Sequence, residues 1–197
     1  MKHIVLVLLL LLSYTNCTLP SSNEPHTQDA GPPERKGCIP HQGSGPRCPA
    51  VQLLDANAWK RIPSEEDPFL KMKTEHHKCL PLGTYVENGV FEIDTGLCNF
   101  ATIVQPLQTE IRQGERLQFT LLHEDLSAPT NATAFVVLSI DGERIWQQEI
   151  PIPSEASYYQ PLWTAHKEIK KGAKIVFHLH NHGANNWTIH SLTAGAL

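Results

Sequence analysis

The chain has 197 residues, of which 41% are hydrophobic and 18% are charged, and its formal net charge is −4. This acidic balance, without a basic stripe interleaved with aromatic residues, excludes nucleic acid as a partner. The length is sufficient for one domain with a hydrophobic core and a flexible lead-in.

The first 17 residues have the layout of a secretory signal peptide. Lys2 and His3 precede an apolar run over residues 4–12, and small or polar residues follow up to Cys17. A run of about ten apolar residues is too short for a membrane-spanning helix, which needs about twenty. The sequence therefore predicts an exported protein, located at the outer membrane or cell surface, or otherwise periplasmic or secreted.

Cys17 lies where a bacterial lipoprotein carries its acylated cysteine, and this segment resembles a loose lipoprotein signal. The usual small residue before that cysteine is replaced by Asn16, and Tyr14 stands where Leu is commonest. Two interpretations follow. Lipidation of Cys17 would anchor the protein in a membrane, whereas ordinary cleavage after Asn16 or Cys17 would release it.

The chain has five cysteines, and assigning Cys17 to a lipid leaves the even set Cys38, Cys48, Cys79 and Cys98. In an oxidising compartment we expect these four to form disulfides, and pairing by proximity joins Cys38 to Cys48 and Cys79 to Cys98. Structural zinc sites commonly use close pairs such as C-x-x-C, and the sequence contains none.

Residues 18–49 are rich in Pro, Gly, Ser and charge and contain few large apolar side chains, so they are predicted to form a disordered tether. Residues 50–197 are predicted to form the folded domain. Its first part, residues 50–82, is a lead-in segment that we expect to pack against the rest.

From Gly83 onward, short segments rich in Val, Ile, Phe, Trp and Thr recur between turn signals. Asp141-Gly142 supplies the positive φ angles of a two-residue type I′ hairpin. Because no long amphipathic helix pattern appears, the sequence predicts an all-β fold, an antiparallel β-sandwich of jelly-roll type. The predicted strands cover residues 84–87, 90–93, 99–105, 109–112, 116–123, 133–140, 143–150, 166–170, 174–181 and 186–193.

The order of the segments GERLQFTLLHED, AFVVLSIDGERIWQQEI and KKGAKIVFHLHNHGANNWTIHSL resembles the jelly-roll sandwich of carbohydrate-binding modules and galactose-binding-like domains. The resemblance covers residues 83–197 and implies a binding module for a glycan. It supplies no calcium or sugar site that can be transferred residue by residue, and a fold does not determine a function.

The most unusual local pattern places His178, His180 and His182 at alternate positions of one predicted strand. Residues two apart share a face of a strand, and neutral imidazole is a common ligand of zinc and copper. His123 and His190 lie on neighbouring predicted strands and could complete a metal site. The alternatives are a polar groove for another ligand and a solvated surface without a role.

Aromatic and amide side chains form a second pattern. Rings that stack on the C–H face of a sugar, with amides that bind its hydroxyl groups, are suited to a glycan site. The alternative is that the tryptophans fill the core. The candidate residues are Tyr158, Tyr159, Trp163, Asn185, Asn186 and Trp187.

Motifs typical of hydrolases, metalloproteases, phosphate-binding loops and dithiol redox enzymes are absent from the sequence. The sequence therefore favours a non-enzymatic binding module of the cell envelope or the secreted fraction, with a glycan or another envelope component as its ligand. One alternative is a histidine-based zinc or copper protein. Another is a structural lipoprotein that contacts a partner protein.

Overall fold

The computed structural model describes residues 48–195 of the chain. The predicted signal peptide (residues 1–17), the tether up to residue 47, and the predicted roles of Cys17 and Cys38 lie outside the described residues. Within residues 48–195, none of the helical turns has the length and apolar character that crossing a lipid bilayer requires.

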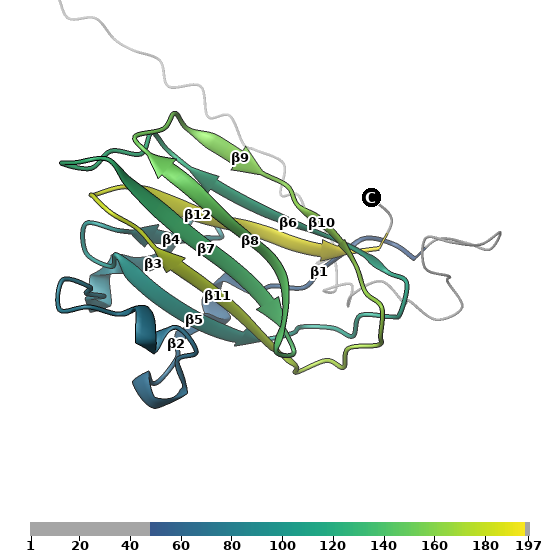
Figure 1. Ribbon diagram of the computed structural model, residues 1–197. Coiled ribbons are helices and arrows are strands. Elements are labelled where there is room, and N and C mark those ends of the chain that lie inside the picture. The colour runs from purple at the N-terminus through teal and green to yellow at the C-terminus, as the bar shows by residue number, and fades with distance from the viewer. Residues whose placement is uncertain (1–47, 196–197) are drawn as a thin grey trace, which may run out of the picture. The chain divides into compact units, whose positions relative to one another are not determined.

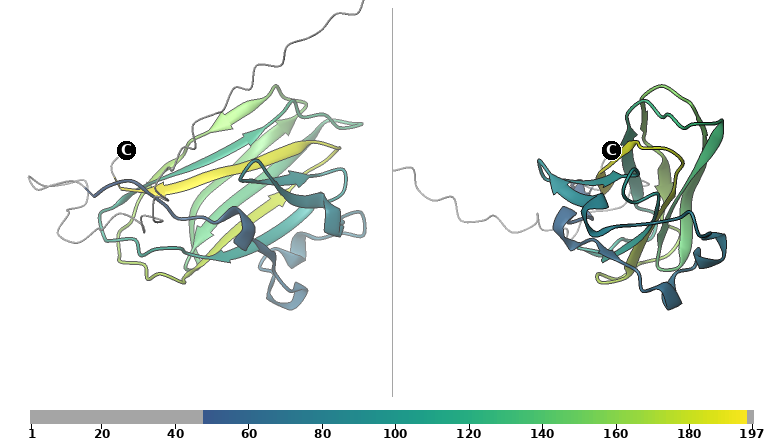
Figure 2. Two further views of the ribbon diagram at one scale, coloured as in Figure 1. Left: turned by 180° about the vertical axis from the view of Figure 1, so that it is seen from behind. Right: turned by 90° about the vertical axis from the view of Figure 1, so that its left-hand side faces the viewer.

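Two antiparallel sheets form the fold (Figures 1 and 2). The seven-stranded sheet contains, from one edge to the other, β3 (Thr84–Glu87), β4 (Val90–Asp94), β12 (Asn186–Ala194) and β6 (Arg116–His123), with β9 (Ser157–Tyr159) and β10 (Leu162–Thr164) both paired to β6, and β1 (Val51–Gln52) paired to β12. The five-stranded sheet contains, in order, β2 (Lys60–Arg61), β5 (Phe100–Pro106), β11 (Lys174–His180), β7 (Ala132–Ile140) and β8 (Glu143–Ile152).

The strand order is that of a jelly roll. After β3, the chain passes from one sheet to the other between β4 and β5, β5 and β6, β6 and β7, β8 and β9, β10 and β11, and β11 and β12. In the lead-in segment it also does so between β1 and β2 and between β2 and β3. The predicted all-β sandwich is therefore confirmed. Helical structure in the described residues consists of 3₁₀ turns at Ala56–Ala58, Ser64–Glu66, Leu70–Met72 and Pro81–Gly83.

The core lies between the two sheets and follows the period-two pattern of the strands. From the seven-stranded sheet, Leu117, Phe119 and Leu121 of β6 point inward, and Phe177 and Leu179 of β11 meet them from the five-stranded sheet. All are buried, and burial of each such side chain contributes about 1.5–3 kcal/mol to folding. Alternation in the sequence thus decides which face of each strand enters the core.

The β7–β8 hairpin confirms the prediction made from Asp141-Gly142. Asp141 has φ of 53° and Gly142 has φ of 77°, as a type I′ turn requires. The turn joins two long strands that form part of the five-stranded sheet.

Two predicted strands are wrong. Residues 109–112 and 166–170 form no ladder and meet only at an isolated bridge, where Ile111 and Ile169 each donate a backbone hydrogen bond of 2.8 Å to the other. These two isoleucines are buried while most of their neighbours stay at the surface, so each segment has one core contact rather than an alternating face. Conversely, β9 and β10 lie between residues 150 and 166, where the sequence predicted no strand. Both are only three residues long, and Pro161 lies between them.

The lead-in segment, residues 50–82, contributes to both sheets. β1 pairs with β12 and β2 pairs with β5, while Leu53 and Trp59 enter the core. The predicted disulfide between Cys79 and Cys98 is present. The predicted pairing of Cys38 with Cys48 stays a prediction, because Cys38 is outside the described residues.

Candidate functional site

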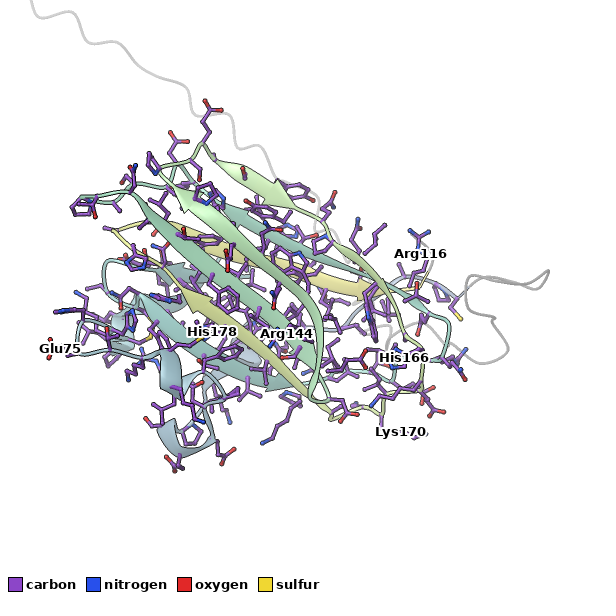
Figure 3. The ribbon with its side chains drawn as sticks, viewed as in Figure 1. Glu75, Arg116, Arg144, His166, Lys170 and His178 are labelled. Carbon is purple, nitrogen blue, oxygen red and sulfur yellow. A yellow bond between two sulfur atoms is a disulfide. The ribbon has the colours of Figure 1, made fainter. Side chains whose placement is uncertain are left out.

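Four histidines gather on the outer face of the five-stranded sheet, the face turned away from the core. We call His77, His178, His180 and His182 the histidine cluster. His178 and His180 alternate along β11 with the core residues Phe177 and Leu179, as predicted. His178, labelled in Figure 3, is nevertheless fully buried, because residues 62–78 lie over it.

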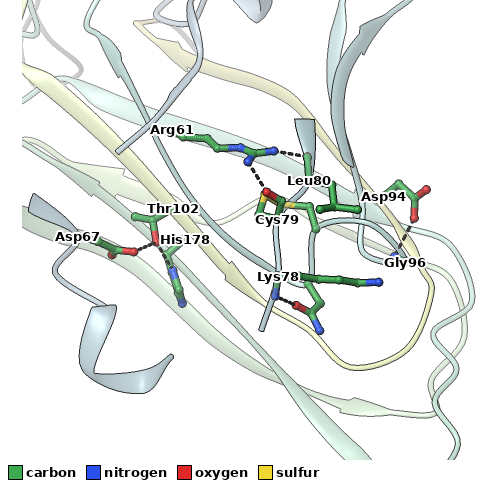
Figure 4. The surroundings of a disulfide bond; sticks show 11 residues. Arg61, Asp67, Lys78, Cys79, Leu80, Asp94, Gly96, Thr102 and His178 are labelled. Carbon is green, nitrogen blue, oxygen red and sulfur yellow. Dashed lines mark hydrogen bonds between the residues drawn. A yellow bond between two sulfur atoms is a disulfide. The ribbon is translucent and has the colours of Figure 1, made fainter. Parts of the chain in front are cut away.

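A short relay of hydrogen bonds defines the tautomer of His178 (Figure 4). The hydroxyl of Thr102 donates to Asp67 Oδ2 over 3.0 Å and lies 2.8 Å from His178 Nδ1. Because the single hydroxyl hydrogen goes to Asp67, the Thr102 oxygen accepts a hydrogen bond from Nδ1–H of His178. Nε2 of His178 is therefore unprotonated, and it is buried without a hydrogen-bond partner among the described residues.

Aromatic rings enclose this imidazole. The ring of Phe69 stacks on His178 with a centroid distance of 3.9 Å and an interplanar angle of 14°. Phe100 approaches the same imidazole edge-on at 4.8 Å. The second half of the cluster is similar: His77 stacks on Phe100 at 5.0 Å and meets His180 at 4.3 Å.

Burial keeps these imidazoles neutral. It is the largest cause that lowers the pKa of His178 to about 3 and that of His180 to about 4, and neighbouring histidines lower both pKa values further. Burial also lowers the pKa of His77. His178 and His180 therefore have no charge at neutral pH in the folded protein.

Of the five histidines predicted as metal ligands, His178, His180 and His182 lie in the histidine cluster, whereas His123 and His190 lie elsewhere. His123 lies in the other sheet, where its Nδ1 donates to the Glu124 carbonyl over 2.7 Å and its Nε2 accepts from the Tyr159 hydroxyl over 3.2 Å. His190 is exposed at a bulge of β12. Within residues 48–195, no three His, Cys, Asp or Glu side chains form a group suited to hold a metal ion. Zinc or copper binding stays a prediction that elemental analysis would test.

The six residues predicted to bind a glycan also differ in how far they are buried. Trp187 is fully buried, and Trp163 and Tyr159 are half-buried and pack against the core. Asn185 is buried and connects two loops, because its side chain accepts from the backbone N–H of Ser127 over 2.8 Å and donates to the His182 carbonyl over 2.9 Å. These positions fit the alternative that aromatic rings fill the core.

Tyr158 has a different environment. It points outward from β9 and is 55% exposed. Asn186 begins β12 opposite Asp94 and is half-buried. Of the six residues in this prediction, Tyr158 offers a ligand the most accessible aromatic ring.

Tyr158 lies at one end of a row of side chains that crosses the outer face of the seven-stranded sheet. The strand register places Tyr158 opposite Leu122, Leu122 opposite Thr188, Thr188 opposite Glu92, and Glu92 opposite Tyr85. We call these five residues the tyrosine row. Four strand spacings of about 4.8 Å separate its ends by about 19 Å. Tyr85, at the far end, is 38% exposed.

The middle of the tyrosine row is polar. The hydroxyl of Thr188 lies 2.9 Å from each carboxylate oxygen of Glu92. Burial raises the pKa of Glu92, and the nearby carboxylates Glu87 and Glu124 raise it further, while the Thr188 hydrogen bond opposes this shift. A half-buried carboxylate held by a hydroxyl in this way is a fixed hydrogen-bond acceptor between two aromatic rings.

The sequence prediction missed Tyr85, Glu92 and Thr188. Residues 84–87 and 90–93 were recognised as strands, and Asn88-Gly89 between them signals a tight turn, so the pairing of Tyr85 with Glu92 was accessible from the sequence. The remaining pairs join strands far apart in the chain, and only the folded structure brings them together.

Comparisons with known proteins concern the fold. No family model and no curated protein matches the chain. Among solved structures, the chain resembles a family 4 carbohydrate-binding module (TM-score 0.38, 12% identity, covering 57% of this chain and 75% of the other). It also resembles a family 16 carbohydrate-binding module (TM-score 0.36, 12% identity, 57% and 82%). A third is TmCBM61 in complex with β-1,4-galactotriose (TM-score 0.34, 10% identity, 74% and 86%). The β-sandwich itself is established by the two sheets, and no ligand follows from these similarities.

Proposed function

We propose that this protein is an exported, non-enzymatic binding module that holds a glycan along the tyrosine row. The observation that supports this function is the register of the seven-stranded sheet, which aligns two exposed tyrosines with a carboxylate and a hydroxyl between them. The Cys79–Cys98 disulfide supports export, because disulfides persist in oxidising compartments.

The chemistry of the row matches that of a sugar chain. A pyranose has apolar C–H faces that pack on aromatic rings and hydroxyl groups that both donate and accept hydrogen bonds. Tyr158 and Tyr85 supply the rings, and Leu122 fills the apolar gap next to Tyr158. Glu92 and Thr188 supply acceptors for the sugar hydroxyl groups, because the single hydroxyl hydrogen of Thr188 is donated to Glu92. A row about 19 Å long is suited to several linked sugars rather than to one.

A panel of cell-envelope and polysaccharide-derived oligosaccharides, screened on an array and followed by calorimetry, tests this function. We expect Tyr158→Ala and Tyr85→Ala each to weaken binding about tenfold, as the loss of a stacking ring does. Tyr159→Phe is the matched control, because Tyr159 follows Tyr158 in β9 but points toward the core. No binding in the panel, or binding that both alanine variants leave unchanged, would reject the proposal.

We include a lipid anchor on Cys17 in the same proposal. It would hold the module at a membrane surface, and the predicted tether would extend it toward its ligand. Mass spectrometry of the mature N-terminus tests this part. A free cysteine or a different first residue would remove the anchor without affecting the tyrosine row.

A further inference from the structure

A groove crosses the outer face of the five-stranded sheet, at the ends of β5 and β11 that lie away from the histidine cluster. Figure 1 shows β5 between β2 and β11, the three strands that line it. The groove has a volume of about 560 Å³, a size typical of small-molecule sites. Its floor is formed by Val104 and Pro106, which alternate along β5 with the core residue Ile103 and with Gln105.

Two lysines flank this floor from opposite sides. Lys60 of β2 pairs with Val104, and Lys174 of β11 pairs with Pro106. Because residues paired across neighbouring strands share a face, both lysine side chains leave the outer face of the sheet. Two strand spacings of about 4.8 Å and an offset of two residues put their Cα atoms about 12 Å apart. Each lysine carries its charge on a flexible four-carbon stem, so both ammonium groups can reach one anion above β5.

The charge in the groove is positive, although the chain as a whole has a net charge of −4. None of the described residues that line it is acidic. The Lys60 side chain forms no ion pair or hydrogen bond with the rest of residues 48–195. Lys174 lies 3.3 Å from Glu66, but both side chains are more than half exposed, and a pair of this kind contributes little. The two ammonium groups are therefore available to an anionic ligand.

One end of the groove is held in place by the 3₁₀ turn at Ala56–Ala58. Asp55 caps this turn, because its carboxylate accepts a hydrogen bond of 2.9 Å from the backbone N–H of Asn57. The backbone N–H of Asp55 in turn donates to Oε1 of the buried Gln105 over 2.8 Å. These bonds fix Asn57 and Ala58, which line the groove, next to β5. The groove is thus a preformed part of the fold.

The lining combines positive charge with apolar surface. Val104, Pro106 and Ala58 supply carbon atoms, and the stems of the two lysines extend this apolar surface up to their ammonium groups. A neutral sugar would leave both charges without a partner, and an inorganic anion would leave the apolar floor exposed to water. A ligand that matches both parts has an anionic group on a hydrocarbon body.

We propose that this groove is a second binding site, which takes a small organic anion with an apolar body, such as a medium-chain carboxylate. The anionic head lies between Lys60 and Lys174, and the hydrocarbon body covers Val104 and Pro106. The tyrosine row belongs to the other sheet, so this site does not depend on the proposed glycan function.

Titration of the full mature chain with sodium octanoate, followed by the chemical shifts of its backbone amides, tests this site. We expect the shifts to concentrate in residues 57–60, 104–106 and 172–174. The neutral analogue 1-octanol should bind at least about fivefold more weakly, because it lacks the charge. Acetate should bind at least about tenfold more weakly, because it lacks the hydrocarbon body. Added salt should weaken the binding of octanoate but not that of octanol.

Variants of the two lysines test which charges hold the head. Lys60→Met and Lys174→Met each keep an apolar stem and remove one charge, and each should weaken octanoate binding about fivefold. Glu66→Gln should strengthen binding, because it removes the carboxylate that competes for Lys174. Lys71→Met is the matched control: Lys71 is exposed but does not line the groove, so octanoate affinity should not change.

Any of four results would overturn the second site. They are the absence of shifts in the groove at millimolar octanoate, shifts that concentrate elsewhere in the molecule, equal affinity for octanoate and octanol, and unchanged affinity in both lysine variants. Lys60 and Lys174 are exposed, so both variants should fold, and their amide spectra outside the groove should match that of the wild type.

Discussion

Replacing Trp187 distinguishes a core residue from a ligand contact. Its side chain is fully buried in β12, and its ring lies 4.7 Å from that of His123. Removing a buried tryptophan costs the transfer free energy of the lost atoms and leaves a cavity, so Trp187→Ala should reduce the free energy of unfolding by about 3–5 kcal/mol. Nε1 of Trp187 has no hydrogen-bond partner among the described residues. Trp187→Phe therefore breaks no hydrogen bond and should cost only about 1–2 kcal/mol.

Urea unfolding followed by far-ultraviolet circular dichroism measures both values, because this signal does not depend on the tryptophan itself. The midpoint should fall while the m value stays the same. Tyr158→Ala is the control: this exposed tyrosine should change stability by no more than about 0.5 kcal/mol. If Trp187→Ala cost less than about 1 kcal/mol, or if the Phe and Ala variants cost the same, the burial argument would be wrong.

Three further variants test local features by the same unfolding assay. Gly183→Ala should destabilise the protein far more than Gly142→Ala, although both glycines have positive φ angles. A Cβ at position 183 would lie 1.9 Å from a backbone oxygen, whereas a Cβ at position 142 meets nothing within 4 Å. Equal losses of unfolding free energy in the two variants would contradict this. Thr95→Val should cost about 1–3 kcal/mol and Thr95→Ser much less, since the buried hydroxyl makes hydrogen bonds to Asn181, Gly183 and Asn185 in the loop between β11 and β12. A Val variant of unchanged stability would contradict this. Replacing Cys79 and Cys98 by Ser should cost about 3 kcal/mol for a sequence separation of 19, and reduction of the wild type should give the same loss.

Most of the strands in the second half of the chain could be predicted because their information is local. The strand over residues 116–123 was predicted with its observed ends, and the Asp141-Gly142 turn correctly joined two strands. Here the alternation of apolar side chains is sufficient to locate the strands, and one turn dipeptide is sufficient to predict which two strands form the hairpin. The same reasoning was wrong for residues 109–112 and 166–170. Each segment has one buried isoleucine, Ile111 or Ile169, and a single buried residue in a short segment resembles the pattern of a strand although only an isolated bridge forms.

The candidate site was less accessible to such reasoning. Alternation correctly separated His178 and His180 from the core residues of β11. It could not show that Phe69, from a segment more than a hundred positions earlier, would cover them. In the same way, the exposed position of Tyr158 and the buried position of Trp187 depend on which strands flank them, and this is a property of the sheet order.

The sequence by itself determined the class of fold, the faces of the long strands and the hairpin at Asp141-Gly142. These follow from side-chain period and turn chemistry, both of which act within a few residues. The Cys79–Cys98 pair was chosen by proximity among three possible pairings, and only the structure decided it. Only the tertiary structure decided that Tyr85 and Tyr158 share one row and that His178 is sealed beneath Phe69. Both arrangements join residues distant in sequence, and their formation depends on the packing free energy of the whole jelly roll rather than on any local preference.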